Sequence, residues 1–433
     1  ERGMLMLTTA IDERSAAFHA LGMAAASGRA AAVITTSGTA VANLLPAAVE
    51  ADRSALPLLL LTADRPQRLK NCGANQTVNQ EDFLASVCRA FMTGPIDGLH
   101  RLSKTQLQAL ADKAWEQTLQ HPGPVHLNLP FEEPLHASRE DQQQAWSAWD
   151  CAGNEQRPFC LPVASAAARP TDCLDWSRPG VVVAGPWRGL EADKPAYQQA
   201  LRTVAECSGW PVLADQLAAI PADLPNLIRH WELLLPRGLP APEAGLQVLR
   251  LGPLPASRRL ESWLRSLGSG QLLISEGEPR CLDPLGMSRQ CSSGLVAWWN
   301  AISTDARFAP SSSRALLTAW AEADAQVQSV LDQHLPAAGA VSEPALMKAL
   351  PELLPQGLPL MLAASSPVRD WQTFAASDLG ARCCFSFRGA SGIDGTLSLA
   401  LGLARVLGPT VLICGDLALQ HDSNGWLLAS EAS

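Results

Sequence analysis

Apolar positions in this chain alternate between short continuous runs and longer segments with helical spacing. In the first third, short runs lie at 31–35, 58–62 and 125–129, and helical patterns lie at 11–24 and 40–51. Short apolar runs separated by helical segments are typical of βαβ units, in which helices cover a parallel sheet. The pattern therefore predicts an α/β fold that begins close to residue 11.

The same alternation starts again twice. A polar stretch at 137–178 has no clear period and is interpreted as a linker, and a long helical pattern at 313–334 precedes a second break. Strands are expected at 180–185, 211–214, 247–251, 271–275, 360–363 and 410–414. We therefore predict three Rossmann-like parallel-sheet domains, at 1–140, 175–335 and 340–433.

Composition narrows the class of protein. The chain has 433 residues, 47% of them apolar, and a net charge of −9, so it can bury large cores and has no basic face for nucleic acid. None of its 11 cysteines forms a C-x-x-C pair, which favours reduced thiols in the cytoplasm over a disulfide framework. No apolar run reaches the length of a membrane span. Because the chain starts at Glu1 and stops within a pattern, we expect a fragment truncated at both ends.

The last unit contains the most informative stretch. Gly389, Gly392 and Gly395 lie in one loop, which is followed by a helical run and a short apolar strand that we expect to be fully buried. The strand ends in Gly415 and Asp416. Ligands of open α/β sheets bind at the carboxyl ends of strands, and an Asp there is a natural ligand for a hard cation. A phosphate and a cation are therefore expected here, although Asp416 could equally cap the next segment.

Arginines follow several predicted strands. They are Arg65, Arg259, Arg369 and Arg388. Each alone is typical of a surface ion pair, but four at strand-to-loop junctions indicate a site for carboxylates, which the guanidinium fork binds bidentately. Glu13, in the first turn of a helix, is by spacing alone only an acid that complements the helix dipole.

Several familiar sites are absent from the sequence. The turn at 185–189, G-P-W-R-G, is not G-x-G-x-x-G, so a dinucleotide site in the middle unit is disfavoured. No P-loop, no G-x-S-x-G elbow and no H-E-x-x-H spacing occurs. P-loop NTPases and serine hydrolases are therefore disfavoured.

Six sequence blocks together resemble a known family. They are D-E-R at 12–14, T-S-G at 36–38, A-D-R-P at 63–66, C-G-A-N-Q at 72–76, R-G-A-S-G-I-D-G at 388–395 and G-D at 415–416. They are similar to the thiamine-diphosphate enzymes, and more narrowly to the branch that joins 2-oxoglutarate to isochorismate in menaquinone and phylloquinone biosynthesis. The resemblance covers essentially the whole chain in order. It implies a pyrimidine-binding domain, a central domain and a diphosphate-binding domain over the three ranges given above.

The resemblance also implies a role for each matching residue. Glu13 would contact N1′ of the cofactor, where a carboxylate stabilises the tautomer that deprotonates thiazolium C2. Ser365, Gly392, Ile393, Gly415 and Asp416 would bind thiamine diphosphate, with Asp416 also a ligand of Mg²⁺ or Mn²⁺. Arg65, Asn75, Gln76, Arg259, Arg369 and Arg388 would bind the two substrates. A second copy of the chain would be needed, because in this family the cofactor bridges two subunits of a dimer or tetramer.

Some family features do not match. The upstream S-R-S turn and the second metal-binding block would lie outside these residues, and Ala363-Ala364 stands where the family commonly has Gly-Asn. The 433 residues alone are therefore expected to be inactive. The alternatives left open are another thiamine-diphosphate decarboxylase, an acetohydroxyacid-synthase-like enzyme, or a folded fragment without catalysis.

Overall fold

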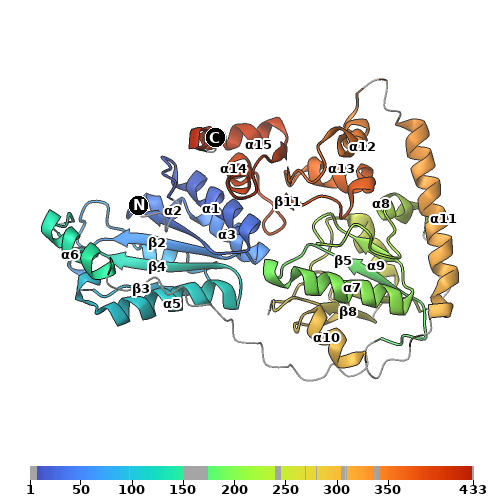
Figure 1. Cartoon of the computed structure of the whole chain (residues 1–433), viewed down its shortest axis with the longest axis horizontal. Coiled ribbons are helices and arrows are strands. Elements are labelled where there is room, and N and C mark those ends of the chain that lie inside the picture. The colour runs from blue at the N-terminus through green and yellow to red at the C-terminus, as the bar shows by residue number, and fades with distance from the viewer. Residues whose placement is uncertain are drawn as a thin grey trace.

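The chain folds around three parallel sheets in a computed structural model, and the predicted α/β class is confirmed (Figure 1). The structure describes residues 7–96, 98–133, 135–150, 174–238, 245–268, 270–278, 280–303, 308, 310–335, 339 and 341–431. Most of the expected linker lies outside these residues. The limits of the three domains stay a prediction.

The first sheet is built from four parallel strands in the order β1-β2-β4-β3. They are β1 (Ala31–Thr35), β2 (Leu58–Asp64), β3 (Ala90–Thr93) and β4 (Pro124–Pro130). Sequence reasoning missed β3, an edge strand with Phe91 45% exposed, because one partly solvated strand gives little apolar signal. Helix α1 (Glu13–Ser27) was expected, but the helix expected at 40–51 is divided into α2 (Thr39–Ala42) and α3 (Leu45–Ser54). The second helix begins at Leu45, and Pro46 lies in its first turn, where proline is favoured.

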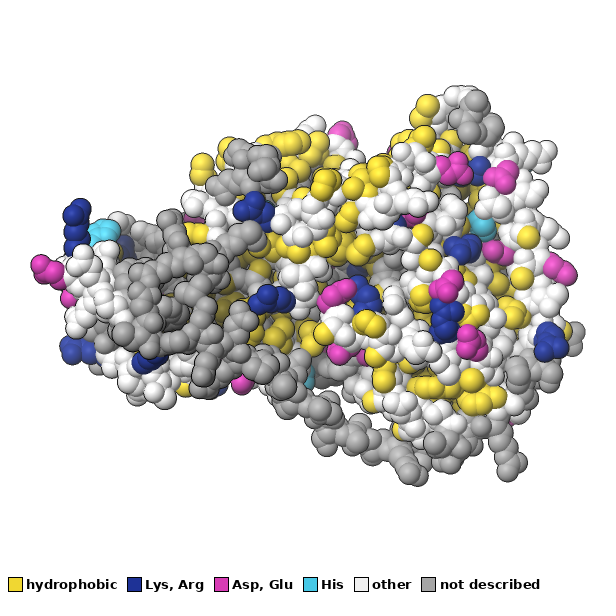
Figure 2. All heavy atoms as spheres, viewed as in Figure 1, with side chains coloured by type: hydrophobic (Ala, Val, Ile, Leu, Met, Phe, Trp, Pro, Cys, Tyr) yellow, Lys and Arg dark blue, Asp and Glu magenta, His cyan; other side chains and the backbone are white. Residues whose placement is uncertain are grey.

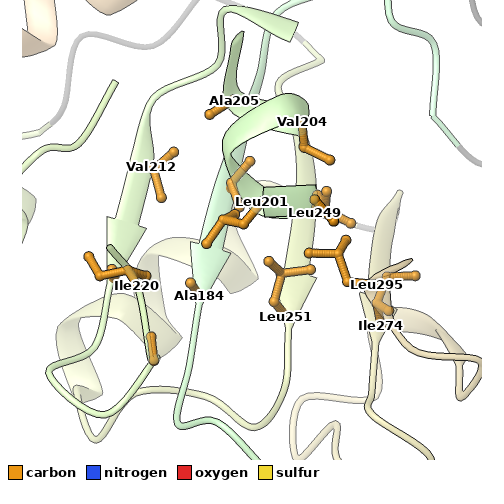
Figure 3. Packing of buried hydrophobic residues seen from close by; sticks show 14 of the residues in the cluster. Ala184, Leu201, Val204, Ala205, Val212, Ile220, Leu249, Leu251, Ile274 and Leu295 are labelled. Carbon is orange, nitrogen blue, oxygen red and sulfur yellow. The ribbon is translucent and has the colours of Figure 1, made fainter. Parts of the chain in front are cut away.

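The central sheet has five parallel strands in the order β6-β5-β7-β8-β9. They are β5 (Gly180–Ala184), β6 (Val212–Ala214), β7 (Gln247–Leu251), β8 (Gln271–Ile274) and β9 (Ser288–Cys291). Figure 3 shows Leu201 and Val204 of α7 (Lys194–Ser208) lying against Leu249 and Leu251 of the sheet, in the largest buried cluster. Strand β9 was missed because its sequence, S-R-Q-C, is polar.

The third sheet has three parallel strands in the order β11-β10-β12. They are β10 (Leu360–Leu362), β11 (Cys384–Ser386) and β12 (Val411–Ile413). The expectation that β12 is fully buried is wrong, because it lies at an edge of the described sheet and is only partly covered. The turn expected at 365–370 is also wrong: helix α13 (Ser366–Phe374) begins there, with Pro367 in its first turn.

The remaining elements cover the sheets or connect them. The further α-helices are α4 (Gln80–Phe83), α5 (Lys104–Gln120), α6 (Arg139–Asp150), α8 (Trp231–Leu234), α9 (Arg258–Ser266), α10 (Leu295–Ile302), α11 (Pro310–His334), α12 (Glu343–Leu353), α14 (Thr396–Leu407) and α15 (Asp416–His421). Short 3₁₀ turns are η1 (Gln67–Leu69), η2 (Leu99–Arg101), η3 (Glu191–Asp193), η4 (Leu235–Arg237), η5 (Ala376–Asp378) and η6 (Ser423–Glu431).

Helices α1 and α14 lie side by side and join the first unit to the third (Figure 1). A Cβ atom placed on Gly22 would lie 2.2 Å from the carbonyl oxygen of Leu399, and one on Gly402 would lie 2.0 Å from that of His19. The two backbones therefore approach each other more closely than any side chain permits. This approach brings the start of α1 to the glycine loop that precedes α14.

Two surface properties bear on function. Within the part of the chain that the structure describes, no helix is long and apolar enough to cross a membrane. Hydrophobic side chains gather where α14 and α15 lie on the face drawn in Figure 2, and Leu417 and Trp426 are 71% and 58% exposed. Exposed apolar side chains of this size, close together in the chain, are typical of surfaces that bind other protein.

Candidate active site

The first turn of α1 is fastened to the third unit on both sides of Glu13. Asp12 caps the helix, and its Oδ2 accepts a 2.6 Å hydrogen bond from Asn424 Nδ2. Arg14 Nη1 lies 4.0 Å from Asp394 Oδ1, in the glycine loop. The half-buried side chain of Glu13 has no hydrogen-bond partner among the described residues. A carboxylate in this position is available to a ligand that enters between the two units.

The three strands of the third sheet end at one edge. Because β10, β11 and β12 are parallel and in register, the residues that follow them lie along the same edge. These are Ser365 after β10, Arg388 after β11, and Gly415 with Asp416 after β12. Asp416 is exposed in the first turn of α15, and none of the described residues bonds its carboxylate. Asp416 is not the N-cap residue of this helix, because Gly415 occupies the cap position. The alternative that Asp416 only caps the next segment is therefore wrong.

The glycines of the 389–395 loop allow contact with the first unit. A Cβ atom on Gly389 would lie 2.8 Å from the carbonyl oxygen of Glu50, and one on Gly395 would lie 1.9 Å from the ring of Phe18. The loop thus approaches helices α3 and α1. Ile393, at its tip, is an apolar side chain that is 40% exposed.

Glu50 occupies the backbone donors of this loop. Its Oε1 accepts a 2.8 Å bond from the Gly389 N–H, and its Oε2 accepts bonds of 2.7 and 3.2 Å from Ala390 and Ser391. Glu50 is 3% exposed, and the hydroxyl of Ser54 donates a further bond to Oε1. Backbone N–H groups that the sequence suggested for a phosphate are therefore used by a buried carboxylate of the same chain. The loop is held in place by α3.

Arg65, Gln76 and the T-S-G turn meet at the carboxyl edge of the first sheet. Arg65 Nη2 lies 3.5 Å from Gln76 Oε1, and Gln76 Nε2 donates a 3.0 Å bond to the carbonyl oxygen of Ser37. Gln76 has φ of 58°, a left-handed conformation that costs energy in a residue with a side chain. Asn75, beside it, is exposed.

A buried polar network supports these loops from below. Gln80 Oε1 accepts a 2.9 Å bond from the Gly38 N–H, and its Nε2 donates to Asn128 Oδ1 at 2.8 Å. Asp64, 4% exposed, accepts bonds from Asn128 at 2.7 Å and from Lys70 Nζ at 2.5 Å. Gln80 and Asp64 thus hold the T-S-G and A-D-R-P blocks in fixed relation to each other.

Three of the predicted arginines line one pocket. Arg259, Arg369 and Arg388 lie around a cavity of about 740 Å³ between the second and third units. Asp215 lines the same cavity, and burial raises the pKa of its carboxyl, while Arg388 opposes that rise. Arg369 Nη1 donates a 2.6 Å bond to the carbonyl oxygen of Ser365, which joins this pocket to the edge of the third sheet.

The predicted site residues therefore fall into two groups. Ser365, Arg369, Arg388 and Asp416 belong to the edge of the third sheet, with Arg259 facing it across the pocket. Arg65, Asn75 and Gln76 belong to the edge of the first sheet, and the described lining of the pocket does not include them. Glu13 lies at the contact between the first and third units.

Sequence reasoning missed Glu50, Gln80 and Asp215. Glu50 had a usable signal: it is an acid on the apolar stripe of a helix, next to the buried Ala47 and Ala51. Asp215 directly follows a buried strand, as Asp416 does, and could have been found by the same rule. Gln80 gave no signal, since an isolated Gln in a polar loop is ordinary.

Comparisons with known proteins agree with this architecture. Residues 2–84 match the family described as "Thiamine pyrophosphate enzyme, N-terminal TPP binding domain". The fold and this match define a thiamine-pyrophosphate enzyme. Proteins named 2-succinyl-5-enolpyruvyl-6-hydroxy-3-cyclohexene-1-carboxylate synthase are similar over nearly all of the chain. That of Synechococcus sp. (strain WH7803) is 67% identical over 437 residues, covering 100% of this chain and 75% of the relative.

Two further relatives carry the same name. The protein of Prochlorococcus marinus (strain MIT 9313) is 59% identical, over 98% of this chain and 75% of its own length. That of Parasynechococcus marenigrum (strain WH8102) is 58% identical, over 100% and 77%. The chain belongs to the 2-succinyl-5-enolpyruvyl-6-hydroxy-3-cyclohexene-1-carboxylate synthase family.

Proposed function

We propose that this protein decarboxylates 2-oxoglutarate and adds the resulting carbanion equivalent to isochorismate. The product would be 2-succinyl-5-enolpyruvyl-6-hydroxy-3-cyclohexene-1-carboxylate, in the biosynthesis of menaquinone or phylloquinone. The observation that carries the proposal is the pocket that Arg259, Arg369 and Arg388 line next to the Ser365 and Asp416 edge. Family membership supports the same reaction.

The residues present fit thiamine diphosphate. Glu13 offers a half-buried carboxylate without a partner among the described residues, and Ile393 presents an exposed apolar side chain on the neighbouring loop. When bound, thiamine diphosphate supplies a carbon nucleophile for the keto group of a 2-oxo acid and a sink for the electrons left when CO₂ departs. Glu13 would hold the proton at N1′ of the aminopyrimidine, and Ile393 would pack against the bound cofactor.

The arginines suit the two substrates because both are dicarboxylates. Three guanidinium groups around one cavity can bind carboxylates bidentately, orient the keto group and exclude other anions by geometry. Arg65, Asn75 and Gln76 bind the second substrate from the edge of the first sheet. Gln80 and Asp64 are positioning residues, since they accept hydrogen bonds from the backbone of the loops that carry these side chains.

A divalent cation, Mg²⁺ or Mn²⁺, is held through Asp416. A hard cation takes oxygen ligands, and Asp416 is an exposed carboxylate at a strand end. The described residues contain no group of three or more His, Cys, Asp or Glu side chains that could hold a metal. Asp416 would therefore be one of several oxygen ligands of the ion.

The active enzyme is a homo-oligomer in the cytoplasm. Exposed Leu417 and Trp426 give α15 and η6 an apolar surface suited to a second copy of the chain. The cysteines of the described part of the chain are all free, which agrees with a reducing compartment.

Product formation from purified protein tests the proposal. The protein is incubated with thiamine diphosphate, Mg²⁺ and 2-oxoglutarate, with and without isochorismate, and products are identified by mass spectrometry. We expect CO₂ release and the succinyl adduct when both substrates are present. Acetolactate from pyruvate at a higher rate would favour an acetohydroxyacid-synthase-like enzyme and contradict the proposal. Calorimetric titration with thiamine diphosphate and Mg²⁺ separates a cofactor-binding protein from a folded fragment that does not bind it.

A further inference from the structure

The turn at 185–189 lies at the place where sheets of this topology bind ligands. The central sheet has its first strand between the second and third, so the chain reverses direction across the sheet beside β5. In such sheets the crevice at the carboxyl ends of the two diverging strands is the usual ligand site. Here the crevice between β5 and β7 is closed: a Cβ atom on Gly185 would lie 1.6 Å from the carbonyl oxygen of Pro253. A nucleotide therefore has no room at that position.

The open space lies on the other side of β5. A cavity of about 340 Å³ is formed at the junction of the three units. Its walls include the turn at 186–190, the loop at 216–220 that follows β6, and β11 with the residues beside it at 380–388. Ala24 of α1 and Leu56, which follows α3, contribute apolar surface from the first unit. Cavities of about 300–1,000 Å³ are large enough to enclose small organic molecules.

Three side chains that line this cavity carry buried polar atoms without a partner. Gln216 Nε2, Trp187 Nε1 and Ser386 Oγ have no hydrogen-bond partner among the described residues. Gln216 is 8% exposed, and its backbone N–H is already bonded to Gln372 Oε1 at 2.9 Å. A buried donor without an acceptor costs about 1–3 kcal/mol, so three around one cavity indicate an acceptor that enters it. Two of the three, the amide and indole nitrogens, can only donate.

The positions of these donors are fixed by the fold. The Trp187 ring lies 4.3 Å from the Tyr197 ring, centroid to centroid, and the backbone N–H of Trp187 donates a 2.7 Å bond to the carbonyl oxygen of Leu217. A Cβ atom on Gly189 would lie 2.2 Å from the Trp187 ring, so only glycine allows this packing. The indole N–H therefore cannot reorient to bond water outside the cavity unless the loop at 185–189 changes its conformation.

Arg188 adds a positive charge to the same wall. Its Nη2 donates a 3.3 Å bond to the carbonyl oxygen of Arg388, and no carboxylate of the described residues lies within ion-pair distance. The nearby carboxylates are paired with other groups. Glu50 accepts the amides of the glycine loop, and Glu191, which also lines the cavity, accepts a 2.7 Å bond from Lys194. Glu278 is bonded to Arg280 at 2.7 Å. Burial lowers the pKa of Arg188 to about 10, which leaves the guanidinium charged at neutral pH.

We propose that this cavity is a second ligand site, which binds a small organic carboxylate with an apolar body. Arg188, Gln216 and Trp187 donate hydrogen bonds to the carboxylate, and Ala24, Leu56 and Ile220 contact the apolar part. The site is separate from the arginine pocket of the proposed reaction, and Arg388 lines both cavities. The inference does not depend on the proposed reaction, because it rests on donors that this reaction does not use.

Binding of benzoate tests the proposal by calorimetry on the whole chain. Benzoate has one carboxylate and an apolar ring, and benzyl alcohol has the same ring without the charge. We expect benzoate to bind and benzyl alcohol to bind at least about tenfold more weakly, as the loss of a charge-assisted hydrogen bond implies. Equal affinity for the two probes would overturn the proposal.

Matched variants locate the binding. Arg188→Met should weaken benzoate binding about 10- to 100-fold, and Trp187→Phe, which keeps an aromatic side chain and removes the donor, about 2- to 10-fold. Arg259→Met, in the other pocket, should leave benzoate binding unchanged. Loss of binding in Arg259→Met with retention in Arg188→Met would assign benzoate to the substrate pocket and contradict us.

A crystal of the protein with 4-bromobenzoate gives the position directly, even if Arg188→Met fails to fold. We expect the anomalous signal of bromine in the cavity between Leu56 and Ile220, with the carboxylate towards Gln216. Ordered water alone on Gln216, Trp187 and Ser386, with no bromine signal there, would refute the site.

Discussion

Glu50 Oε1 accepts a 2.8 Å hydrogen bond from the backbone N–H of Gly389, a residue 339 positions later in the chain. The bond joins a helix of the first unit to the loop that carries Arg388 and Ile393. Since Arg188 of the central unit also donates to the carbonyl oxygen of Arg388, all three units meet at this loop. The position of the site residues on the loop thus depends on how the units pack.

Glu50→Gln should disturb both stability and substrate binding. The new amide nitrogen would face backbone N–H groups, so at least one bond is lost, which costs about 1.5–3 kcal/mol for a charged acceptor. Because the loop carries Arg388, we also expect KM for 2-oxoglutarate to rise while the site chemistry is otherwise intact. Thermal unfolding and steady-state kinetics measure the two effects.

Asp283→Asn is the matched control for Glu50→Gln. Asp283 is also a buried carboxylate that accepts backbone amides, from Leu285, Met287 and Ser288, but it lies within the central unit. Because Asp283 also pairs with the buried Arg250, we expect a loss of stability at least as large, with unchanged KM. If both variants raise KM equally, the effect of Glu50 is general destabilisation and its positioning role is wrong.

Glu13→Gln should nearly abolish turnover in the active enzyme. Proton transfer by a positioned side chain contributes about 10²–10⁴-fold to rate, and glutamine cannot exchange the proton at N1′. The fold should be retained, because no described residue bonds the Glu13 carboxylate. Circular dichroism measures the fold and product formation measures turnover. An unchanged rate would contradict the catalytic role assigned to Glu13.

Arg388→Ala should weaken the binding of a dicarboxylate substrate. Loss of one guanidinium–carboxylate contact corresponds to a rise in KM of about 10- to 100-fold. Arg202→Ala is the control, since Arg202 is paired with Asp223 on the surface of the central unit. Wild-type constants for both substrates in Arg388→Ala would remove Arg388 from the site.

Stability should fall as the pH is lowered from about 6.5 to about 4, in part because of His126. Its Nε2 lies 2.8 Å from Thr62 Oγ1 in the buried network, and burial lowers the pKa of His126 to about 4. In this pH window the unfolded chain binds the proton and the folded chain does not, so protonation favours unfolding. The slope attributable to one group is at most about 1.4 kcal/mol per pH unit.

His126→Gln isolates this contribution, because glutamine can donate to Thr62 but does not titrate. Chemical denaturation at several pH values should give a shallower dependence for the variant than for the natural protein. Parallel curves would contradict the prediction, because they would show that His126 has the same pKa in the folded and unfolded chains.

Most of the sheet structure could be predicted, since β2, β4, β5, β7 and β8 are largely apolar runs with most residues buried. Strand β1 was also predicted because its residues are apolar, although Ala32 and Ile34 are exposed. The missed strands, β3, β9 and β11, lie at sheet edges, where partial solvation removes the apolar signal. The predicted turn at 365–370 is a helix because a serine followed by a proline starts helices as well as turns.

The residues of the candidate site could be predicted where their place after a strand is visible in the sequence. Arg259, Arg369 and Arg388 were singled out because they follow strands, and the structure brings them to one pocket. The hydrogen bonds that hold the Arg388 loop in place could not be predicted. Glu50 reaches Gly389 only through the packing of two units, and no local pattern encodes a contact over that distance.

The glycine pair at the crossing of α1 and α14 limits how the sequence can change. Gly22 and Gly402 each face the backbone of the other helix, with no space for a methyl group. An alanine at either position would separate the helix axes, and the start of α1 would move with them. The distance between Glu13 and the loop at 389–395 therefore depends on the absence of a side chain at Gly22 and Gly402, which are not residues of the proposed active site. A designer who wishes to widen the site could begin at this crossing and leave every ligand-binding residue unchanged.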